Sequence, residues 1–157
     1  MKFFLTTFFL LLLFFTASTI TAQDVIKQVA CKDELISHQV DSIKTAMSKE
    51  GYLVLKEASM TMESQYEMPV IVPLTQGSWY QFVFIGDISS KLYEVTMYDW
   101  SEKQVAHQKK LWGDVDGNVI SFRYIPPTSE YHMMKTIQVN KKKKNVCGYV
   151  MLLKKVK

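Results

Sequence analysis

From Gly51 to the C-terminus, apolar and polar residues alternate in short segments that turn residues separate. A period of two residues is that of a β-strand with one buried face. Short strands at regular spacing are typical of antiparallel sandwiches and barrels. We therefore expect a mainly β fold, a single antiparallel, jelly-roll-like β-sandwich of about eight strands. The expected strands cover residues 52–62, 70–72, 79–85, 92–99, 103–111, 119–124, 131–139 and 146–153.

The strongest strand signal lies at residues 79–85, which are apolar on both faces. A strand of this kind is expected in the centre of a sheet, with both faces covered. We expect residues 92–99 to form the next strand and to pair with it. The short segment 70–72 lies between Pro69 and Pro73 and is expected at a sheet edge, because proline cannot donate to a strand ladder.

One amphipathic helix is expected before the strands. Asp33 can cap its start, and Gly51 can end it in a left-handed conformation. Apolar residues recur between them at the spacing of a single helix face. These residues are Ile36, Val40, Ile43 and Met47.

Residues 1–22 have the layout of a secretory signal peptide. A basic start, Met1-Lys2, precedes an almost unbroken apolar run at residues 3–15, and small residues then lead to Ala22. We expect cleavage after Ala22 and a secreted or periplasmic domain of residues 23–157. The apolar run is shorter than the ~20 residues of a spanning helix, so we expect no transmembrane segment after cleavage.

Cys31 and Cys147 are the two cysteines of the chain. In an exported protein an even count favours a disulfide, and two cysteines allow only one pairing. Two separate buried thiols are the alternative. The tripeptide at 29–31 is also similar to the end of a lipobox, but Gln28 stands where leucine is expected.

Three segments carry strand motifs that belong to one family of secreted domains. Residues 74–82 read as a leucine, a turn with glycine and a tyrosine-led strand, and residues 93–99 end in Met-Tyr-Asp. Residues 125–131 contain two prolines, a turn and a tyrosine. The pattern resembles bacterial pre-peptidase C-terminal-type β-sandwich domains. The resemblance implies a non-catalytic secreted jelly-roll-like sandwich and no catalytic residue.

Aromatic residues near predicted turns are the candidates for ligand binding. Trp100 and Trp112 stand at predicted strand ends beside charged residues, so among the tryptophans they are the better candidates for an exposed pair. Exposed aromatic planes can stack on the apolar face of a sugar. A glycan site would need Trp100, Trp112 and the nearby Tyr98 or Asp99 on one surface. The favoured interpretation is that these rings cap the ends of the core, with the glycan site as the alternative.

Oxygen-bearing side chains alternate at Asp114, Asp116 and Asn118, as they do at the start of a calcium loop. Val119 and Ile125 stand where an EF-hand needs Gly and Glu. A β-turn is the favoured interpretation, because Gly and Asn tolerate positive φ. We expect no cofactor other than this weak possibility of calcium.

Side chains that could support catalysis are scattered along the sequence. No histidine stands at metal-ligand spacing from another, and no G-x-S-x-G motif is present. Paired carboxylates could form only if the fold brings distant acids together. We expect no enzyme. The residues in question are His38, His107, His132, Asp87, Glu94, Asp99 and Glu102.

The formal net charge of +4 arises largely from lysines at 141–144 and at the C-terminus. The lysine run lacks the interleaved aromatics that stack bases, so nucleic acid is not an expected partner. We expect a non-enzymatic binding or structural module of the bacterial periplasm or cell surface, with a carbohydrate or an envelope protein as partner. An envelope-structural or protein-interaction module would present an apolar patch or a strand edge at 70–72 that is competent to pair.

Overall fold

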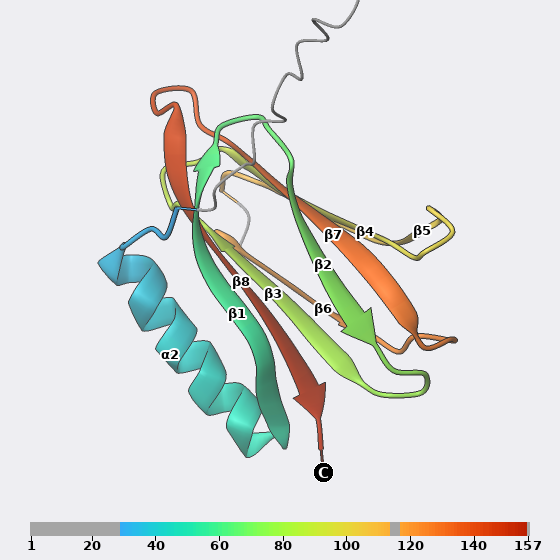
Figure 1. Cartoon of the computed structure of the whole chain (residues 1–157). Coiled ribbons are helices and arrows are strands. Elements are labelled where there is room, and N and C mark those ends of the chain that lie inside the picture. Colours follow the sequence, from blue (N-terminus) through green and yellow to red (C-terminus); the bar gives the residue numbers. More distant parts are fainter. Residues whose placement is uncertain (1–28, 114–116, 157) are drawn as a thin grey trace, which may run out of the picture.

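Within residues 29–113 and 117–156, which the computed structural model describes, eight antiparallel strands form two sheets and one helix lies outside them (Figure 1). The first sheet has the order β1-β8-β3-β6 and the second the order β2-β7-β4-β5. This order is that of a jelly roll, so the predicted mainly β, jelly-roll-like sandwich is confirmed. The strands are β1 Tyr52–Glu63, β2 Met68–Leu74, β3 Tyr80–Gly86, β4 Leu92–Tyr98, β5 Gln104–Leu111, β6 Val119–Tyr124, β7 Glu130–Val139 and β8 Asn145–Lys155.

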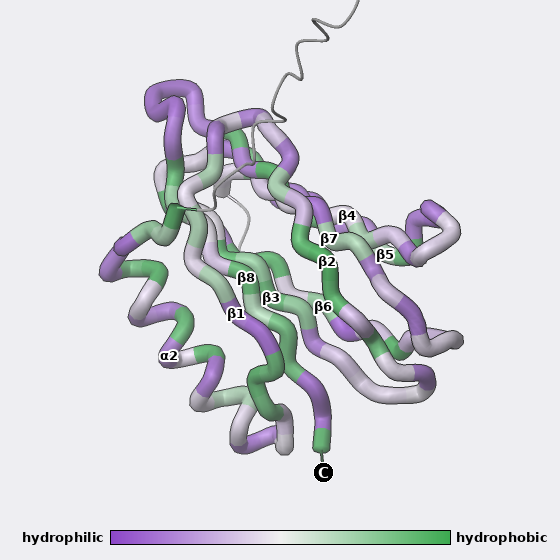
Figure 2. The backbone as a smooth tube through the Cα atoms, in the orientation of Figure 1, coloured by the Kyte–Doolittle hydropathy of each residue, from purple (hydrophilic) through white to green (hydrophobic). Residues whose placement is uncertain are grey.

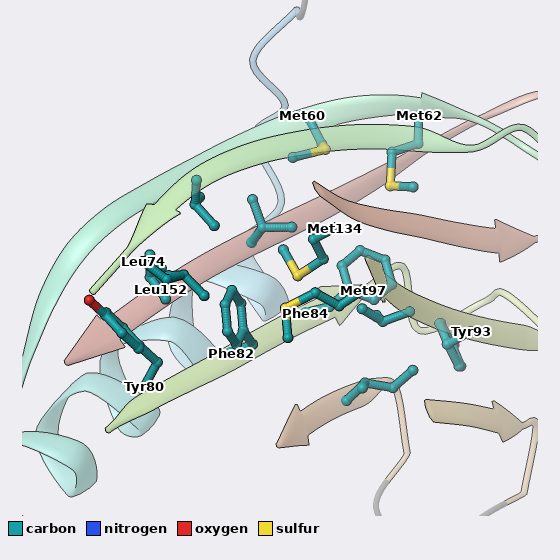
Figure 3. Packing of buried hydrophobic residues seen from close by; sticks show 14 of the residues in the cluster. Met60, Met62, Leu74, Tyr80, Phe82, Phe84, Tyr93, Met97, Met134 and Leu152 are labelled. Atoms are coloured by element: carbon teal, nitrogen blue, oxygen red, sulfur yellow. The ribbon is translucent and has the colours of Figure 1, made fainter. Parts of the chain in front are cut away.

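The main core fills the space between the two sheets (Figure 3). Met60 and Met62 of β1 and Phe82 and Phe84 of β3 face Met134 of β7 there, and all five side chains are buried. Burial of one such side chain contributes about 1.5–3 kcal/mol. This interior therefore supplies most of the hydrophobic stabilisation of the sandwich.

Helix α2 (Glu34–Lys49) covers the outer face of the first sheet (Figure 1). The Asp33 carboxylate accepts a hydrogen bond from the backbone N–H of Ile36 at 3.0 Å, and Gly51 follows the helix with φ 83°. Ile36 and Val40 pack in a second core on the first sheet, with Val83, Ile85, Met151 and Leu153. The predicted helix and both of its end signals are confirmed.

Strand β3 is buried along its whole length, and it lies between β8 and β6. One face of β3 contacts the main core and the other contacts the core under α2. The prediction of a central strand covered on both sides is therefore confirmed. Strand β2 lies at an edge, as expected, although it is longer than predicted and includes Pro69 and Pro73.

The predicted pairing of β3 with β4 is wrong. Strand β4 pairs with β5 and β7 in the second sheet. The connection between them bonds to β7: the N–H of Asp87 donates to Gln138 Oε1 at 2.9 Å, and the N–H of Lys91 donates to the carbonyl of Val139 at 2.7 Å. These bonds carry the chain from one sheet to the other.

Cys31 and Cys147 form a disulfide, as predicted, with 5.7 Å between their Cα atoms. Cys147 lies in β8 and Cys31 lies just before α2, so the bridge ties the start of the helix to a central strand. The expected signal peptide lies outside the described residues. In the part of the chain that the structure describes, no helix is both long and apolar enough to cross a membrane.

A buried polar cluster closes the end of the sandwich where β3 leads to β4. Gln138 of β7 reaches across the interior, and its Nε2 donates to the carbonyl of Cys147 at 2.7 Å. Room for this side chain comes from Gly86 and Gly148, which are paired neighbours on β3 and β8. Asp87 is buried at the same end and pairs with Lys143 of the hydrophilic β7–β8 loop at 3.0 Å (Figure 2).

Candidate functional site

The two sheets differ in what covers their outer faces. Helix α2 packs on the first sheet, whereas no described element covers the second (Figure 1). On β4 and β7, buried residues alternate with partly exposed ones, so every second side chain points away from the core. The outer face of the second sheet is therefore accessible to a ligand.

A groove of about 200 Å³ lies at one end of this face. Ile71 of β2 and Met133 of β7 are direct neighbours across the sheet, and Tyr98 of β4 is the next residue in the same row. The β4–β5 turn forms the remaining wall. We call this site the aromatic groove; its lining includes Ile71, Asp99, Trp100, Glu102, Tyr131 and Met133.

Two aromatic rings dominate the groove. Trp100 is 71% exposed and Tyr131 is 54% exposed. Their ring centroids lie 6.0 Å apart, with the planes inclined at 51°. Tyr98 lies in the row of Met133, and its ring holds the Lys135 ammonium 5.4 Å from its centroid. Large apolar surfaces that stay exposed in one place mark a binding site more often than isolated exposed residues do.

The β4–β5 turn fixes the position of Trp100. Asp99 Oδ1 accepts hydrogen bonds from the backbone N–H groups of Ser101 and Lys103, each at 2.9 Å. An aspartate that bonds to the backbone ahead of it is a common way of closing a turn. Glu102 takes a left-handed conformation with φ 60° in the same turn. These contacts hold the Trp100 ring against Tyr131 and away from the core.

His132 lies buried beneath the groove, on the core side of β7. Its Nε2 is 3.2 Å from the hydroxyl of Tyr124. Burial raises the pKa of Tyr124, and the negative charges of Asp99 and Glu130 raise it further.

The structure brings Tyr98, Asp99 and Trp100 together but does not bring Trp112 to them. Trp100 and Trp112 are 71% and 72% exposed, so the favoured interpretation that they cap the core is wrong for both. They stand beyond opposite ends of β5, whose eight residues separate them by about 25 Å at the usual strand rise. The predicted group of four residues is therefore divided between the two ends of the sandwich.

Of the predicted calcium ligands, Asp114 and Asp116 lie outside the described residues. Asn118 is buried, and its Oδ1 already accepts a hydrogen bond from Gln39 Nε2 at 2.8 Å. Its Nδ2 donates to the carbonyl of Gly86 at 2.6 Å. Asn118 thus joins α2, β3 and β6. No group of three or more His, Cys, Asp or Glu side chains within 29–113 and 117–156 could hold a metal.

The four acids considered for catalysis lie in three places. Asp87 lies in the buried polar cluster, and Glu94 pairs with His107 at 2.8 Å on the second sheet. Asp99 and Glu102 alone share the aromatic groove. His38 lies on the exposed side of α2, as expected. The structure therefore assembles neither the three histidines nor the four acids into one constellation.

Sequence reasoning missed the contribution of β2 and β7 to the groove. Ile71, Tyr131 and Met133 come from segments far from Trp100 in the sequence. One signal was present in β7, where Tyr131 and Met133 occupy the face opposite the core residues His132 and Met134. Apolar residues grouped on a face that has no helix over it are a signal of an interaction surface.

No protein-family model matches the chain, and no curated protein matches it in sequence. Solved structures that are similar include a CBM4 structure (carbohydrate-binding module), at 14% identity and TM-score 0.42, over 67% of this chain and 79% of the other. The CBM22-1 and GH10 modules of Clostridium thermocellum xylanase 10B show 11% identity and TM-score 0.38, over 69% and 26%. The tailspike protein 4 of bacteriophage CBA120 shows 10% identity and TM-score 0.40, over 65% and 19%. These values are too low to bear on function.

Proposed function

We propose that the chain is an exported, non-enzymatic module that binds a glycan in the aromatic groove. The observation that carries this proposal is the exposed ring pair of Trp100 and Tyr131, held by a hydrogen-bonded turn in a concavity of the uncovered sheet face. Binding would cover apolar surface that water now contacts. The role follows from this geometry and not from the similar solved structures.

The chemistry of the groove suits a sugar. A pyranose ring presents an apolar face of C–H groups and a rim of hydroxyls. The rings of Trp100 and Tyr131 offer planes for the apolar face, and the carboxylates of Asp99 and Glu102 can accept hydrogen bonds from hydroxyls. A few polar groups beside apolar walls are the usual composition of a small-molecule site.

Export is supported by the disulfide between Cys31 and Cys147, because such bonds persist in oxidising compartments. A signal peptide at 1–22 would place the chain there. The absence of an enzymatic role is part of the proposal. It is supported by the position of Asp99, whose Oδ1 already accepts two backbone hydrogen bonds that close a turn.

A glycan screen on the full chain, expressed for export, tests this function. We expect binding to at least one oligosaccharide, and a loss of roughly ten-fold or more in affinity for Trp100→Ala and for Tyr131→Ala. Trp112→Ala is the matched control, because it removes an equally exposed tryptophan at the far end of the sandwich. Binding that survives Trp100→Ala but not Trp112→Ala would contradict the assignment.

A second candidate function is binding of an envelope protein, favoured by an apolar groove of about 130 Å³ between the edge strands β1 and β2. Strand addition to β2 is disfavoured. The carbonyl of Ile71 accepts from Lys56 Nζ at 3.3 Å, so it faces the open edge. Residues 69 and 73 lie two positions before and after Ile71, so their backbone groups face the same open edge. Both are prolines, which have no N–H to donate to an added strand.

Capture of proteins from an envelope extract separates the two candidates. Lys56→Glu reverses a charge at the rim of the β1–β2 groove, and Trp100→Ala changes only the aromatic groove. A partner lost with Lys56→Glu and kept with Trp100→Ala would favour the protein-binding function.

A further inference from the structure

Two acidic side chains line the aromatic groove, and His132 lies buried beneath it. Asp99 and Glu102 both come from the β4–β5 turn, and the lining contains no lysine or arginine. Their carboxylates stand beside the ring pair of Trp100 and Tyr131. A ligand in the groove therefore meets two negative charges and two aromatic planes together.

Lys103 follows Glu102 in the same turn, and two further lysines near the groove have partners of their own. Lys135 pairs with Glu67 at 2.8 Å, and this hydrogen bond raises the pKa of Lys135. Lys56 donates to the carbonyl of Ile71 at the edge of β2. Neither ammonium forms a salt bridge with Asp99 or Glu102 in the described part of the chain, although the negative charge of Glu102 also contributes to the raised pKa of Lys135.

The turn that presents these carboxylates is held in place before any ligand arrives. Asp99 Oδ1 bonds to the backbone of its own turn, which leaves Oδ2 without a bond to any described residue. The Glu102 side chain is exposed, and its backbone N–H donates to the carbonyl of Asp99 at 3.1 Å. A site built in this way binds without a large loss of side-chain entropy at Asp99.

We propose that the groove selects a glycan that carries positive charge, an oligosaccharide with free amino groups, over neutral and anionic glycans. This inference rests on the proposed glycan-binding function. An ammonium group gains charge-assisted hydrogen bonds from the two carboxylates. It also gains attraction from the faces of Trp100 and Tyr131. A uronic acid or sulfated sugar meets like charge there and is rejected.

The test compares hexamers of glucosamine, N-acetylglucosamine and glucose, together with an oligogalacturonate, by titration calorimetry on the full chain. A pH of about 5.5 keeps the amino groups of the glucosamine hexamer charged. We expect the glucosamine hexamer to bind at least ten-fold more tightly than either neutral hexamer, and the oligogalacturonate to bind least. The advantage of the glucosamine hexamer should shrink as salt is added, because exposed charges are screened.

Two variants locate the effect. Asp99→Asn with Glu102→Gln should bring the affinity for the glucosamine hexamer down to that for the N-acetylated one. Glu34→Gln with Asp41→Asn removes the same charge from the exposed surface of α2 and should leave all affinities unchanged. Because Asp99 holds the turn, Glu102→Gln alone is also measured; it should give part of the loss without disturbing Trp100.

The outcomes separate the inference from the function on which it rests. Equal binding of charged and neutral hexamers that depends on Trp100 would overturn the charge selectivity and keep the glycan-binding function. The helix variant and the groove variant could also abolish the preference for the glucosamine hexamer to the same extent. That result would show nonspecific attraction of a polycation and would overturn the charge selectivity of the groove. Absence of binding by every oligosaccharide would overturn both.

Discussion

Gly86→Ala should destabilise the protein through a clash in the buried polar cluster. A Cβ on Gly86 would lie 2.5 Å and 2.6 Å from the Tyr93 ring carbons Cδ1 and Cε1. Carbon atoms in contact normally lie about 3.5–4.0 Å apart, so the ring would have to move by about 1 Å. The ring is not free to do so, because the Tyr93 hydroxyl donates to the carbonyls of Asp87 and Ser90 at 2.8 and 3.0 Å.

The magnitude follows from three contributions. Overpacking of a filled interior costs about 1–3 kcal/mol, and a weakened Tyr93 hydrogen bond costs about 1 kcal/mol more. Replacing a glycine in a strand returns about 0.5–1 kcal/mol. The expected net loss in the free energy of unfolding is about 2 kcal/mol, within a range of about 1–3.5 kcal/mol, or a fall in Tm of roughly 6–8 °C at the central value.

Urea and thermal unfolding followed by circular dichroism would measure this loss. Gly77→Ala is the control, because Gly77 has φ 69° and no atom within 4 Å of the added Cβ. It isolates the backbone cost of about 1 kcal/mol. Gly148→Ala should fall between the two, because its Cβ meets the flexible Met62 side chain. A Gly86→Ala protein as stable as the Gly77→Ala protein would refute the reasoning.

Three further predictions concern stability. Reduction of the Cys31–Cys147 bond, which closes a sequence separation of 116, should lower the free energy of unfolding by up to ~4–5 kcal/mol in the chain-entropy model; equal Tm values with and without reductant would contradict this. Burial would raise the pKa of Asp87, but hydrogen bonds from Ser89 and Lys143 outweigh it and hold that pKa below its ordinary value. Asp87 therefore stabilises the fold above its unfolded-state pKa and loses this contribution as the pH falls through its folded-state pKa. The free energy of unfolding should fall less steeply with decreasing pH in Asp87→Asn than in the native protein. Identical curves would argue against the Asp87 contacts. Millimolar calcium should leave Tm unchanged, because Asn118 Oδ1 already accepts a hydrogen bond from Gln39. An increase in Tm would support a calcium site and contradict this prediction.

The helix and the central strand could be predicted because their signals are local. Asp33 and Gly51 mark the ends of α2, and both are set by bonds within a few residues. Both faces of β3 are apolar in sequence because one face packs in the main core and the other packs under α2. In each case the residues that carry the pattern are the residues that make the contacts.

The partner of β4 could not be predicted because the connection at 87–91 is compatible with a hairpin or with a crossing between sheets. Long-range bonds to Gln138 and Val139 decide between them. The groove escaped prediction for a related reason. Trp100 and Trp112 are close in sequence, yet β5 holds them apart, while Tyr131 reaches Trp100 only through the pairing of β4 with β7.

The most direct test of the central claim, that the aromatic groove is the ligand site, is amide chemical-shift mapping. The isotope-labelled full chain would be titrated with the oligosaccharide that binds most tightly in the screen. We predict that shifts concentrate at residues 99–103 and 131–133 and at Ile71, with the Trp100 indole N–H among the largest. Shifts centred on Trp112, or on the groove between β1 and β2, would contradict the assignment.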